Sequence, residues 1–490
     1  MCCSHVLILR REFIINSLFL LLTNFLIRPI YILFIDMQVQ NRVGPEEYGL
    51  YFLMYDFAFL FIALNDPGLQ AYSSRLLASN KDNIPTLFSE LAGLKITLGF
   101  IFIAISFITA MLLGYNERQL QLLGLIGAGM VLSSSFILMR TVLTGLGAYR
   151  IDTFLSSLDR VLLIILLGSV LYLGYFSDEL TIEFFAGIQV FAYFLACLII
   201  FLVLIKTNMI RWPSFHFKKM LQVLQSTLPF AGVILLTSIC NRIDVVMINE
   251  MLPEKTALYQ SGVYAAGYRF LDAANMVGFL FGSLLLPMFA RMLAEKIDLK
   301  PLFQTGFGLL LMISTLIGLS CVFYASNIFS IAYTDVYDQH SDIMYPLMLS
   351  LIPITLSNAF GPLIMAHGKL KTLNIALISA IGLNVVLNLI VIPEYAALGT
   401  AYTTLITEIF LLFCMYVIAH QQTGISLENK LLRNSVLFVF LSALTIYLLT
   451  FVELHWLIEI VIFITLGFSL ALLLNIMHPK GIQLIKDRRF

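Results

Sequence analysis

Residues 228–248 read LPFAGVILLTSICNRIDVVMI, an apolar run that carries Arg242 and Asp244 in its second half. A helix of about 20 apolar residues crosses a bilayer, whereas strands are neither so long nor so uniformly apolar. Similar runs recur along the whole 490-residue chain, and charged residues make up only 12% of it. Soluble proteins carry about 25% charged residues. The sequence therefore predicts an all-α polytopic membrane protein with charges at membrane depth.

The apolar runs predict about fourteen transmembrane helices. They cover residues 13–35, 48–65, 91–113, 120–140, 153–176, 184–205, 225–250, 258–289, 301–325, 343–366, 372–392, 396–419, 432–451 and 455–476. Cytoplasmic loops hold an excess of Lys and Arg. With these spans, 21 of the 29 basic residues lie on the side of the N-terminus, and three, Arg42, Arg118 and Lys255, lie opposite. Both termini are therefore expected in the cytoplasm.

Several classes of function lack their sequence signals. The net charge is zero, so no basic face indicates a nucleic-acid partner. The six cysteines are scattered without a CxxC pair, and no HExxH motif or cluster of His and Cys indicates a metal. No GxxxxGK[ST] phosphate loop occurs. We therefore expect no metal, no cofactor and no ATP hydrolysis by this chain.

An internal repeat relates the two halves of the chain. GLYFLMYDF (residues 49–57) and GVYAAGYRF (262–270) share Gly, Tyr, Tyr and Phe at an offset of 213. Upstream, TNFLIR (23–28) and TSICNR (237–242) share Thr and Arg at an offset of 214. Matches in the same order at a nearly constant offset indicate duplication of a structural unit.

The duplication predicts two pseudo-symmetric six-helix lobes. Because six is even, both lobes have the same orientation and are related by an axis along the membrane normal. Two further helices follow the second lobe. The predicted divisions are an N-terminal lobe (1–205), a cytoplasmic connector (206–224), a C-terminal lobe (225–419), and a last part (420–490) with spans 13 and 14 and a cytoplasmic tail. The basic and aromatic connector is expected on the inner membrane surface.

Charged residues inside the spans are the candidate site. The repeat makes Arg28 the counterpart of Arg242, and Asp56 the counterpart of Arg269. All four lie about eight to eleven residues from the external ends of their helices, which is about 12 to 16 Å at a rise of 1.5 Å per residue. They are therefore expected in one layer in the outer half of the membrane.

Two interpretations of this layer remain open. A charge facing lipid costs a few kcal/mol or more, so these side chains should face the protein interior. In the first, the charges only neutralise one another: Arg28 with Asp56, and Arg242 or Arg269 with Asp244 or Asp272. In the second, the arginines hold an anionic group, because the guanidinium fork suits phosphate oxygens. The acids then position the arginines or carry a coupling cation.

Weaker candidates lie in other spans. Asp159 and Arg160 are adjacent in span 5, so they do not share a helix face, and Glu408 lies in span 12. Lys95 in span 3 lies close to the inner end, where a long side chain can extend its charge to the interface.

Five segments carry a resemblance to a known family. They are VGPEEYGLY (43–51), NDPGLQAYSSRLLA (65–78), LPFAGVILLTSICNRIDVVMI (228–248), SGVYAAGYRFLDAANMVG (261–278) and NVVLNLIVIPEYAALGTAYTTLITE (384–408). Together they resemble the polysaccharide transporter, or Wzx-type flippase, branch of the multidrug/oligosaccharidyl-lipid/polysaccharide exporter superfamily. The resemblance implies a non-enzymatic transporter of the bacterial inner membrane. It would move a lipid-pyrophosphate-linked oligosaccharide from the inner to the outer leaflet by alternating access.

The resemblance also implies roles for particular residues. In this family, cavity arginines on the early helices of each lobe bind the pyrophosphate. By helix position, that role falls to Arg28, Arg242 and Arg269. The sequence departs from the simplest cationic cavity by placing acids in the same layer: Asp56, Asp244 and Asp272. Membrane lipid, a coupling ion (H⁺ or Na⁺) and polymerase or other polysaccharide-assembly proteins are the partners it implies.

Two other functions are weighed against the flippase. A multidrug or cation exporter of the same superfamily would depend on the acids more than on the arginines. A saccharide polymerase or ligase would normally need a sizeable external loop with catalytic residues, and the longest expected external connection covers only residues 326–342. Its acids, Asp335, Asp338 and Asp342, are typical of a solvated loop.

Overall fold

Within the residues it describes, the computed structural model contains helices and the loops that join them, and no strand. These are residue 27 and residues 29–80, 83–173, 180–207, 209, 211–334, 340–425, 427–452 and 454–476. The chain forms two compact units, one up to Val246 and one from Met247 onward. The boundary falls inside helix α11 (Phe217–Met251).

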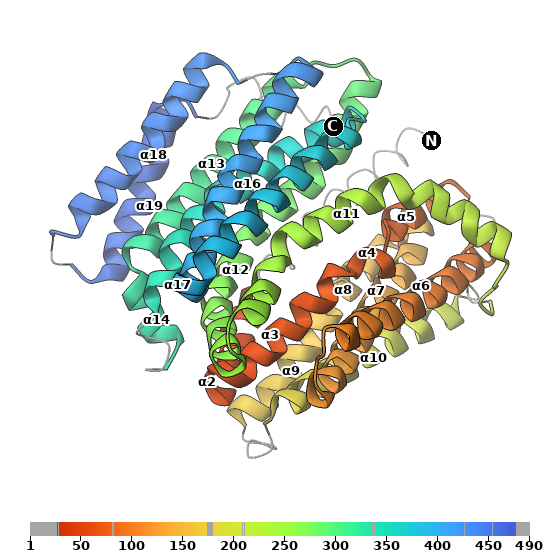
Figure 1. The fold of residues 1–490 in the computed structure, drawn as a ribbon. Coiled ribbons are helices and arrows are strands. Elements are labelled where there is room, and N and C mark those ends of the chain that lie inside the picture. Colours follow the sequence, from red (N-terminus) through yellow and green to blue (C-terminus); the bar gives the residue numbers. More distant parts are fainter. Residues whose placement is uncertain are drawn as a thin grey trace. The chain divides into compact units, whose positions relative to one another are not determined.

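The first unit is built around α7 (Figure 1). Its helices are η1 (Tyr31–Asp36), α2 (Met37–Val43), α3 (Pro45–Leu60), α4 (Ile62–Asn65), α5 (Leu69–Ser79), α6 (Ile84–Leu112), α7 (Glu117–Gly145), α8 (Tyr149–Leu155), α9 (Leu158–Tyr172), α10 (Ile182–Lys206) and most of α11. Helix α7 begins at a capping box, in which Asn116 and Gln119 each bond the other's backbone N–H. It packs against α3, α5, α6 and α10.

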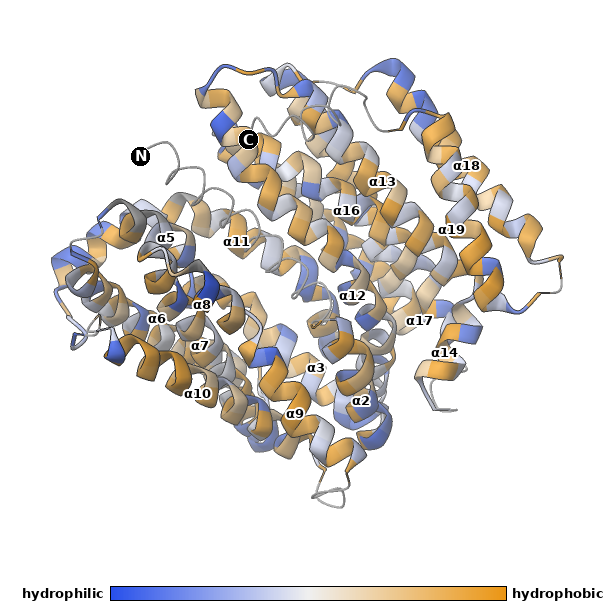
Figure 2. Cartoon of the chain, turned by 180° about the vertical axis from the view of Figure 1, so that it is seen from behind, coloured by the Kyte–Doolittle hydropathy of each residue, from blue (hydrophilic) through white to orange (hydrophobic). Residues whose placement is uncertain are grey.

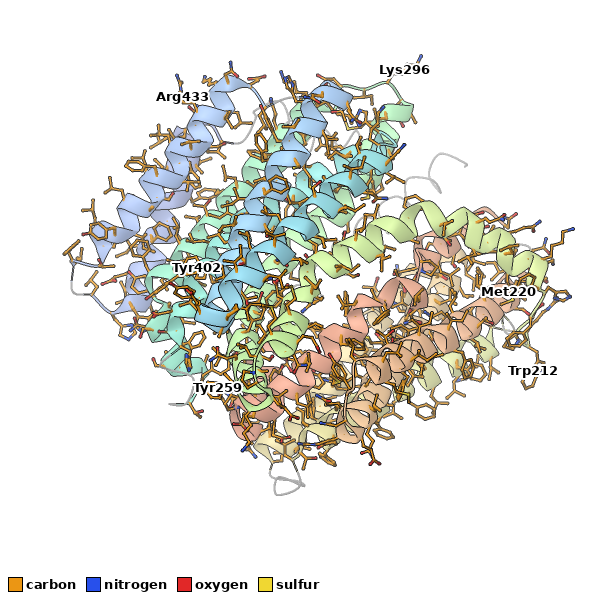
Figure 3. The ribbon with its side chains drawn as sticks, in the orientation of Figure 1. Trp212, Met220, Tyr259, Lys296, Tyr402 and Arg433 are labelled. Atoms are coloured by element: carbon orange, nitrogen blue, oxygen red, sulfur yellow. The ribbon has the colours of Figure 1, made fainter. Side chains whose placement is uncertain are left out.

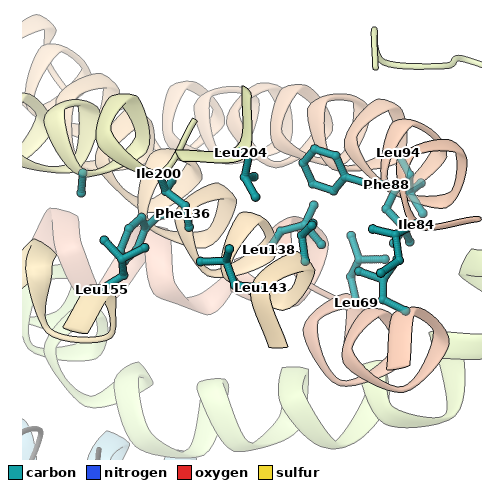
Figure 4. Packing of buried hydrophobic residues seen from close by; sticks show 14 of the residues in the cluster. Leu69, Ile84, Phe88, Leu94, Phe136, Leu138, Leu143, Leu155, Ile200 and Leu204 are labelled. Carbon is teal, nitrogen blue, oxygen red and sulfur yellow. The ribbon is translucent and has the colours of Figure 1, made fainter. Parts of the chain in front are cut away.

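Close packing of α5 on α7 depends on a small residue. A Cβ at Gly145 would lie 3.0 Å from the Cβ of Leu77, which is tighter than ordinary contact. Beside it, Leu69, Phe88 and Phe136 belong to one buried apolar cluster that joins α5, α6, α7 and α10 (Figure 4). This cluster fixes one end of the first unit.

The second unit is built around α12 and α16, which pack against each other. Its helices are α12 (Glu254–Ala294), α13 (Lys300–Phe323), α14 (Ala325–Ala332), η4 (Ser341–Ile343), α16 (Met344–Ala366), α17 (Leu370–Ile418), η5 (Ala419–Thr423), α18 (Asn429–Leu449) and α19 (Trp456–Leu473). Helices α18 and α19, the predicted spans 13 and 14, pack against α13. A Cβ at Gly467 would lie 2.3 Å from the terminal Cδ2 of Leu316, so a larger residue there would displace that leucine side chain.

The all-α polytopic class is confirmed, but the number of spans is not fixed at fourteen. Among the described residues, 11 helices are long and apolar enough to cross a membrane, or 12 if the bent pair Pro45–Leu60 and Ile62–Ser74 is one span. Most of the predicted span 13–35 lies outside the described residues. The predicted spans 372–392 and 396–419 fall in α17, which is interrupted at Ala396 with φ 47° and ψ −130°.

Apolar side chains cover the outer surfaces of many helices (Figure 2). Phe100 on α6, Phe194 on α10 and Phe440 on α18 are exposed, as expected for surfaces that face lipid. Hydrophilic residues gather near helix ends in the same view. The pattern is that of a multi-pass membrane protein.

The connector lies against α6. Ser214 N–H donates to the Ser89 carbonyl at 2.9 Å, and Ser89 Oγ donates to the Trp212 carbonyl at 2.5 Å. A Cβ at Gly93 would lie 2.1 Å from the Ser214 carbonyl oxygen, so only glycine lets the two backbones approach. The Trp212 side chain is held outward and is almost fully exposed (Figure 3). Its placement at the inner membrane surface stays a prediction.

Candidate functional site

A buried ion pair joins α3 to α11 within the first unit. Arg242 Nη1 lies 3.2 Å from Asp56 Oδ1, at hydrogen-bond distance. Asp56 is 1% exposed, and the Arg242 side chain is 13% exposed. The sequence paired Asp56 with Arg28, which lies outside the described residues, so that pairing stays a prediction. Removing one member of such a buried pair leaves an uncompensated charge, which costs about 3–5 kcal/mol.

Two aromatic rings of α3 also contact the Arg242 guanidinium. Its Cζ lies 5.3 Å from the centroid of the Phe59 ring and 6.0 Å from that of Tyr55. The rings stack on each other because residues four apart share a helix face. A guanidinium over an aromatic face is stabilised by the ring quadrupole. Sequence reasoning missed these rings, although Tyr55 and Phe59 flank Asp56.

The second unit carries a different pair in α12. Arg269 Nη1 lies 3.7 Å from Asp272 Oδ2, as their i, i+3 spacing predicted. That distance exceeds a normal hydrogen bond. Arg269 is buried, whereas the Asp272 side chain is 26% exposed. Asp56 and Asp272 thus differ in their exposure as well as in their partner.

The remaining predicted acids are also buried. Asp244 lies in α11 within the first unit, and Glu408 lies in α17 within the second. One turn before Glu408, Thr404 Oγ1 lies 3.1 Å from the Tyr264 hydroxyl of α12. These residues form part of a polar interior rather than a lipid-facing surface. Across the part of the chain that the structure describes, no group of three or more His, Cys, Asp or Glu is placed to hold a metal ion.

Asp159 and Arg160 lie on α9 beside a cavity. Arg160 Nε is 3.7 Å from Asp159 Oδ2, and Arg160 Cζ is 5.3 Å from the centroid of the Tyr31 ring. The cavity has a volume of about 280 Å³, and Arg160, Tyr55 and Phe59 line it. The sequence contained no signal for the cavity, because helices α3, α4, α7, α9 and α10 form it together.

The expectation for Lys95 was wrong. The side chain does not extend to an interface, because Lys95 is 3% exposed inside the first unit. Its Nζ donates to the Asn65 carbonyl at 2.6 Å, to Asn65 Oδ1 at 2.7 Å and to Ser134 Oγ at 2.5 Å. Three acceptors offset the loss of hydration, so the ammonium is accommodated inside the unit.

The predicted external loop, residues 326–342, is described except for residues 335–339, and its first part lies in α14. Asp335 and Asp338 lie outside the described residues, and Asp342 lies in η4. Next to it, His340 Nε2 is 2.9 Å from the Tyr259 hydroxyl of α12. Burial lowers the pKa of His340, and the nearby Asp342 opposes that change. The contact between His340 and Tyr259 ties this loop to α12.

Arg242 and Arg269 are each paired with an acid of their own unit, Asp56 and Asp272. A guanidinium has five N–H donors in a planar fork. Phosphate oxygens accept two parallel hydrogen bonds from such a fork. Exchange of the acid for a phosphate at either arginine stays a prediction.

Comparisons with known proteins give one match to a family. A family model described as "Polysaccharide biosynthesis protein" matches residues 13–293, more than half of the chain. No curated protein sequence matches the chain.

Several solved structures have a similar fold. The lipid II flippase MurJ, in an inward closed conformation, covers 99% of this chain and 100% of its own, with 15% identity and a TM-score of 0.66. An inward-facing multidrug resistance MATE family transporter of the MOP superfamily covers 83% of this chain and 98% of its own, with 13% identity and a TM-score of 0.60. A MATE transporter of Vibrio cholerae covers 83% and 94%, with 17% identity and a TM-score of 0.57. At these identities the likeness concerns the fold.

Proposed function

Because the chain belongs to the family of polysaccharide biosynthesis proteins, we propose that it is a flippase for a lipid-pyrophosphate-linked oligosaccharide. The substrate would be a repeat unit of O-antigen, capsule or exopolysaccharide. The proposed movement is from the inner to the outer leaflet of a bacterial inner membrane, with both termini in the cytoplasm. One fold neighbour is itself described as a flippase of lipid II, which supports a lipid-linked substrate.

The observation that carries the proposal is Arg242, held at membrane depth in α11. Its guanidinium is partly exposed, hydrogen-bonded to Asp56 and stacked over aromatic rings. A charge in this position is costly unless it serves a pair or a ligand. A phosphate can replace the carboxylate as acceptor, because each group presents a pair of oxygens that fits the guanidinium fork.

The proposed mechanism separates the head group from the lipid tail. The pyrophosphate binds Arg242, Arg269 and Arg28 while the polyprenyl tail stays in the bilayer. Alternating access then exposes the site to the opposite side of the membrane. Asp56 and Asp272 hold the arginines in place when the substrate has left. An H⁺ or Na⁺ gradient or the membrane potential supplies the energy.

Transport in proteoliposomes tests this function. A labelled undecaprenyl-pyrophosphate oligosaccharide should cross the bilayer faster with the protein than without it, and faster still with a gradient. Arg242→Gln and Arg269→Gln should each lower the rate at least tenfold, because a charge-assisted hydrogen bond contributes about 1.5–3 kcal/mol. Arg291→Gln, which removes an exposed arginine paired with Glu295, is the matched control. A normal rate of transport in both Arg242→Gln and Arg269→Gln would refute the proposed site.

A second candidate is an ion-coupled exporter of drugs or cations. The solved MATE transporters share the fold, and Asp56 is a fully buried acid of the first unit. In that case Asp56→Asn and Asp272→Asn would abolish export of a cationic dye, while Arg269→Gln would leave it unchanged. Measuring both substrates with the same variants separates the two functions.

A further inference from the structure

The first unit contains a cavity that is separate from Arg242. Helices α3, α4, α7, α9 and α10 enclose about 280 Å³, roughly the volume of nine water molecules at about 30 Å³ each. Polar groups from several helices line it, among them Tyr55, Ser133, Gln189 and Arg160. A small ion with a few waters fits this space, whereas an oligosaccharide does not. The cavity is therefore too small for the whole head group.

Arg160 is the charged group of this cavity with open hydrogen-bonding capacity. Its described contacts are the ion pair with Asp159 at 3.7 Å, which is too long for a hydrogen bond, and the face of the Tyr31 ring. Its buried Nε–H has no hydrogen-bond partner within the described structure. A buried donor without an acceptor is costly. The Arg160 side chain as a whole is 27% exposed and lines the cavity, so the rest of the guanidinium can meet a ligand there.

Neighbouring residues orient the polar wall beside Arg160. Gln189 Oε1 accepts from the Tyr51 hydroxyl at 2.9 Å, and Gln189 Nε2 donates to the Tyr31 hydroxyl at 3.2 Å. Because both ends of the amide are bonded, Gln189 is fixed in orientation. Tyr31 is in turn the ring that Arg160 covers. The guanidinium thus lies in a pre-organised polar wall rather than among mobile side chains.

The other charges near the cavity are already bound. Asp66, which lines it, accepts backbone N–H groups of Gly68 and Leu69 at 3.1 and 2.6 Å, at the start of α5. Lys95 donates its three bonds to Asn65 and Ser134. With Asp159 included, two cations face two carboxylates, so the cavity has no net charge. An anion there would be held by the hydrogen-bond donors of Arg160 and not by an excess of positive charge.

We propose that this cavity is a second binding site, in which Arg160 holds a small oxyanion of the phosphate class. Two sources share this chemistry: free inorganic phosphate, and a phosphate of a lipid-linked molecule. Tyr55 and Phe59 line the cavity and also stack against Arg242, so the two sites share a wall. Anion binding at Arg160 is a property of the first unit and holds whether or not the chain is a flippase.

Calorimetric titration of the purified full-length protein in detergent tests the site. The probes are inorganic phosphate and farnesyl pyrophosphate. Arg160→Gln should weaken binding of at least one probe about tenfold or more, because it removes a charge-assisted bond. Arg160→Lys should restore part of the affinity, and Arg291→Gln should change neither titration. An Arg160-dependent phosphate signal identifies the free anion as a source, and a signal with farnesyl pyrophosphate alone identifies the lipid-linked group.

A second pair of variants tests the cavity without touching the charge. Gly129 lines it, and a Cβ there meets Tyr193 at an ordinary 3.7 Å. Gly129→Ala should therefore fold and bind normally, whereas Gly129→Leu should occupy the space and weaken binding. If Arg160→Gln does not fold, the comparison of Gly129→Leu with Gly129→Ala still tests whether the anion binds in the cavity. Unchanged titrations in Arg160→Gln and Gly129→Leu, or loss of all binding in Arg242→Gln alone, would overturn the proposal.

Discussion

Asp56 and Arg269 occupy equivalent positions of the internal repeat but carry opposite charges. In the first unit, Asp56 of α3 bonds to Arg242, which lies 186 residues further along the chain. In the second unit, Arg269 of α12 pairs with Asp272, one turn later on the same helix. The first pair joins two helices, and the second constrains only the helix that carries it. Duplicated positions therefore neutralise charge in structurally different ways.

The two pairs also differ in geometry. The Arg242–Asp56 contact of 3.2 Å is a hydrogen bond between buried groups, and aromatic rings cover the guanidinium. The Arg269–Asp272 contact of 3.7 Å is longer, and its acid is partly exposed. Loss of the acid should therefore cost much more stability in the first unit than in the second. The following predictions test that difference.

The largest effect is expected from Asp56→Ala. The substitution leaves Arg242 buried beside the site of the lost carboxylate, which should destabilise the protein by about 3–5 kcal/mol. Thermal unfolding in detergent measures it as a clear drop in melting temperature. Asp152→Ala is the control. It removes a carboxylate paired with Arg140, which lies near the C-terminal end of α7, and so measures the loss of a different, partly buried ion pair. A melting temperature equal to that of the unaltered protein would contradict the pairing.

The next effect is the coupling between the two residues. A double-mutant cycle of Asp56→Ala and Arg242→Ala should give an interaction free energy of about 1–3 kcal/mol, because the partners touch. The same cycle for Arg269→Ala and Asp272→Ala should give a smaller interaction free energy, because the two groups are 3.7 Å apart and do not form a hydrogen bond. Equal coupling in both cycles would remove the distinction between the units.

The sequence included one pair, Arg269 with Asp272, among its open alternatives and missed the other, Arg242 with Asp56, for a physical reason. The spacing of Arg269 and Asp272 fixes their common helix face, so this contact followed from 3.6 residues per turn. The partner of Asp56 depends on how α3 and α11 rotate and pack, which no local spacing determines. The expectation for Lys95 was wrong for a similar reason, because its acceptors, Asn65 and Ser134, lie on other helices.

The fold was more predictable than the site. Long apolar runs predicted the helices directly, because backbone groups at membrane depth must bond within a helix. The cavity of the first unit had no sequence signal, since its wall combines residues from five helices. Arg160 was identified as a charge at membrane depth, but its open hydrogen-bonding capacity depends on the tertiary structure.

A smaller effect is expected from the aromatic wall. Phe59→Leu keeps an apolar side chain of similar size but removes the ring under Arg242, whose Cζ is 5.3 Å from its centroid. A cation–π contact contributes about 0.5–2 kcal/mol, depending on its exposure to water. The melting temperature should fall modestly, by less than in Asp56→Ala. Phe440→Leu on α18, an exposed position, is the matched control and should leave it unchanged. Equal melting temperatures for Phe59→Leu and the control would show that the ring does not stabilise Arg242.

The smallest effect is expected from Asp272→Asn. The change keeps the size of the side chain and removes only a charge that lies 3.7 Å from Arg269 and is 26% exposed. Pairs at this helix spacing contribute about 0.2–0.5 kcal/mol. Unfolding of Asp272→Asn should therefore be close to that of the unaltered protein, while Asp56→Asn under the same conditions is clearly destabilised. If the two variants unfold alike, the buried hydrogen bond between α3 and α11 does not distinguish the units, and the arginines of both would be held equally by their acids.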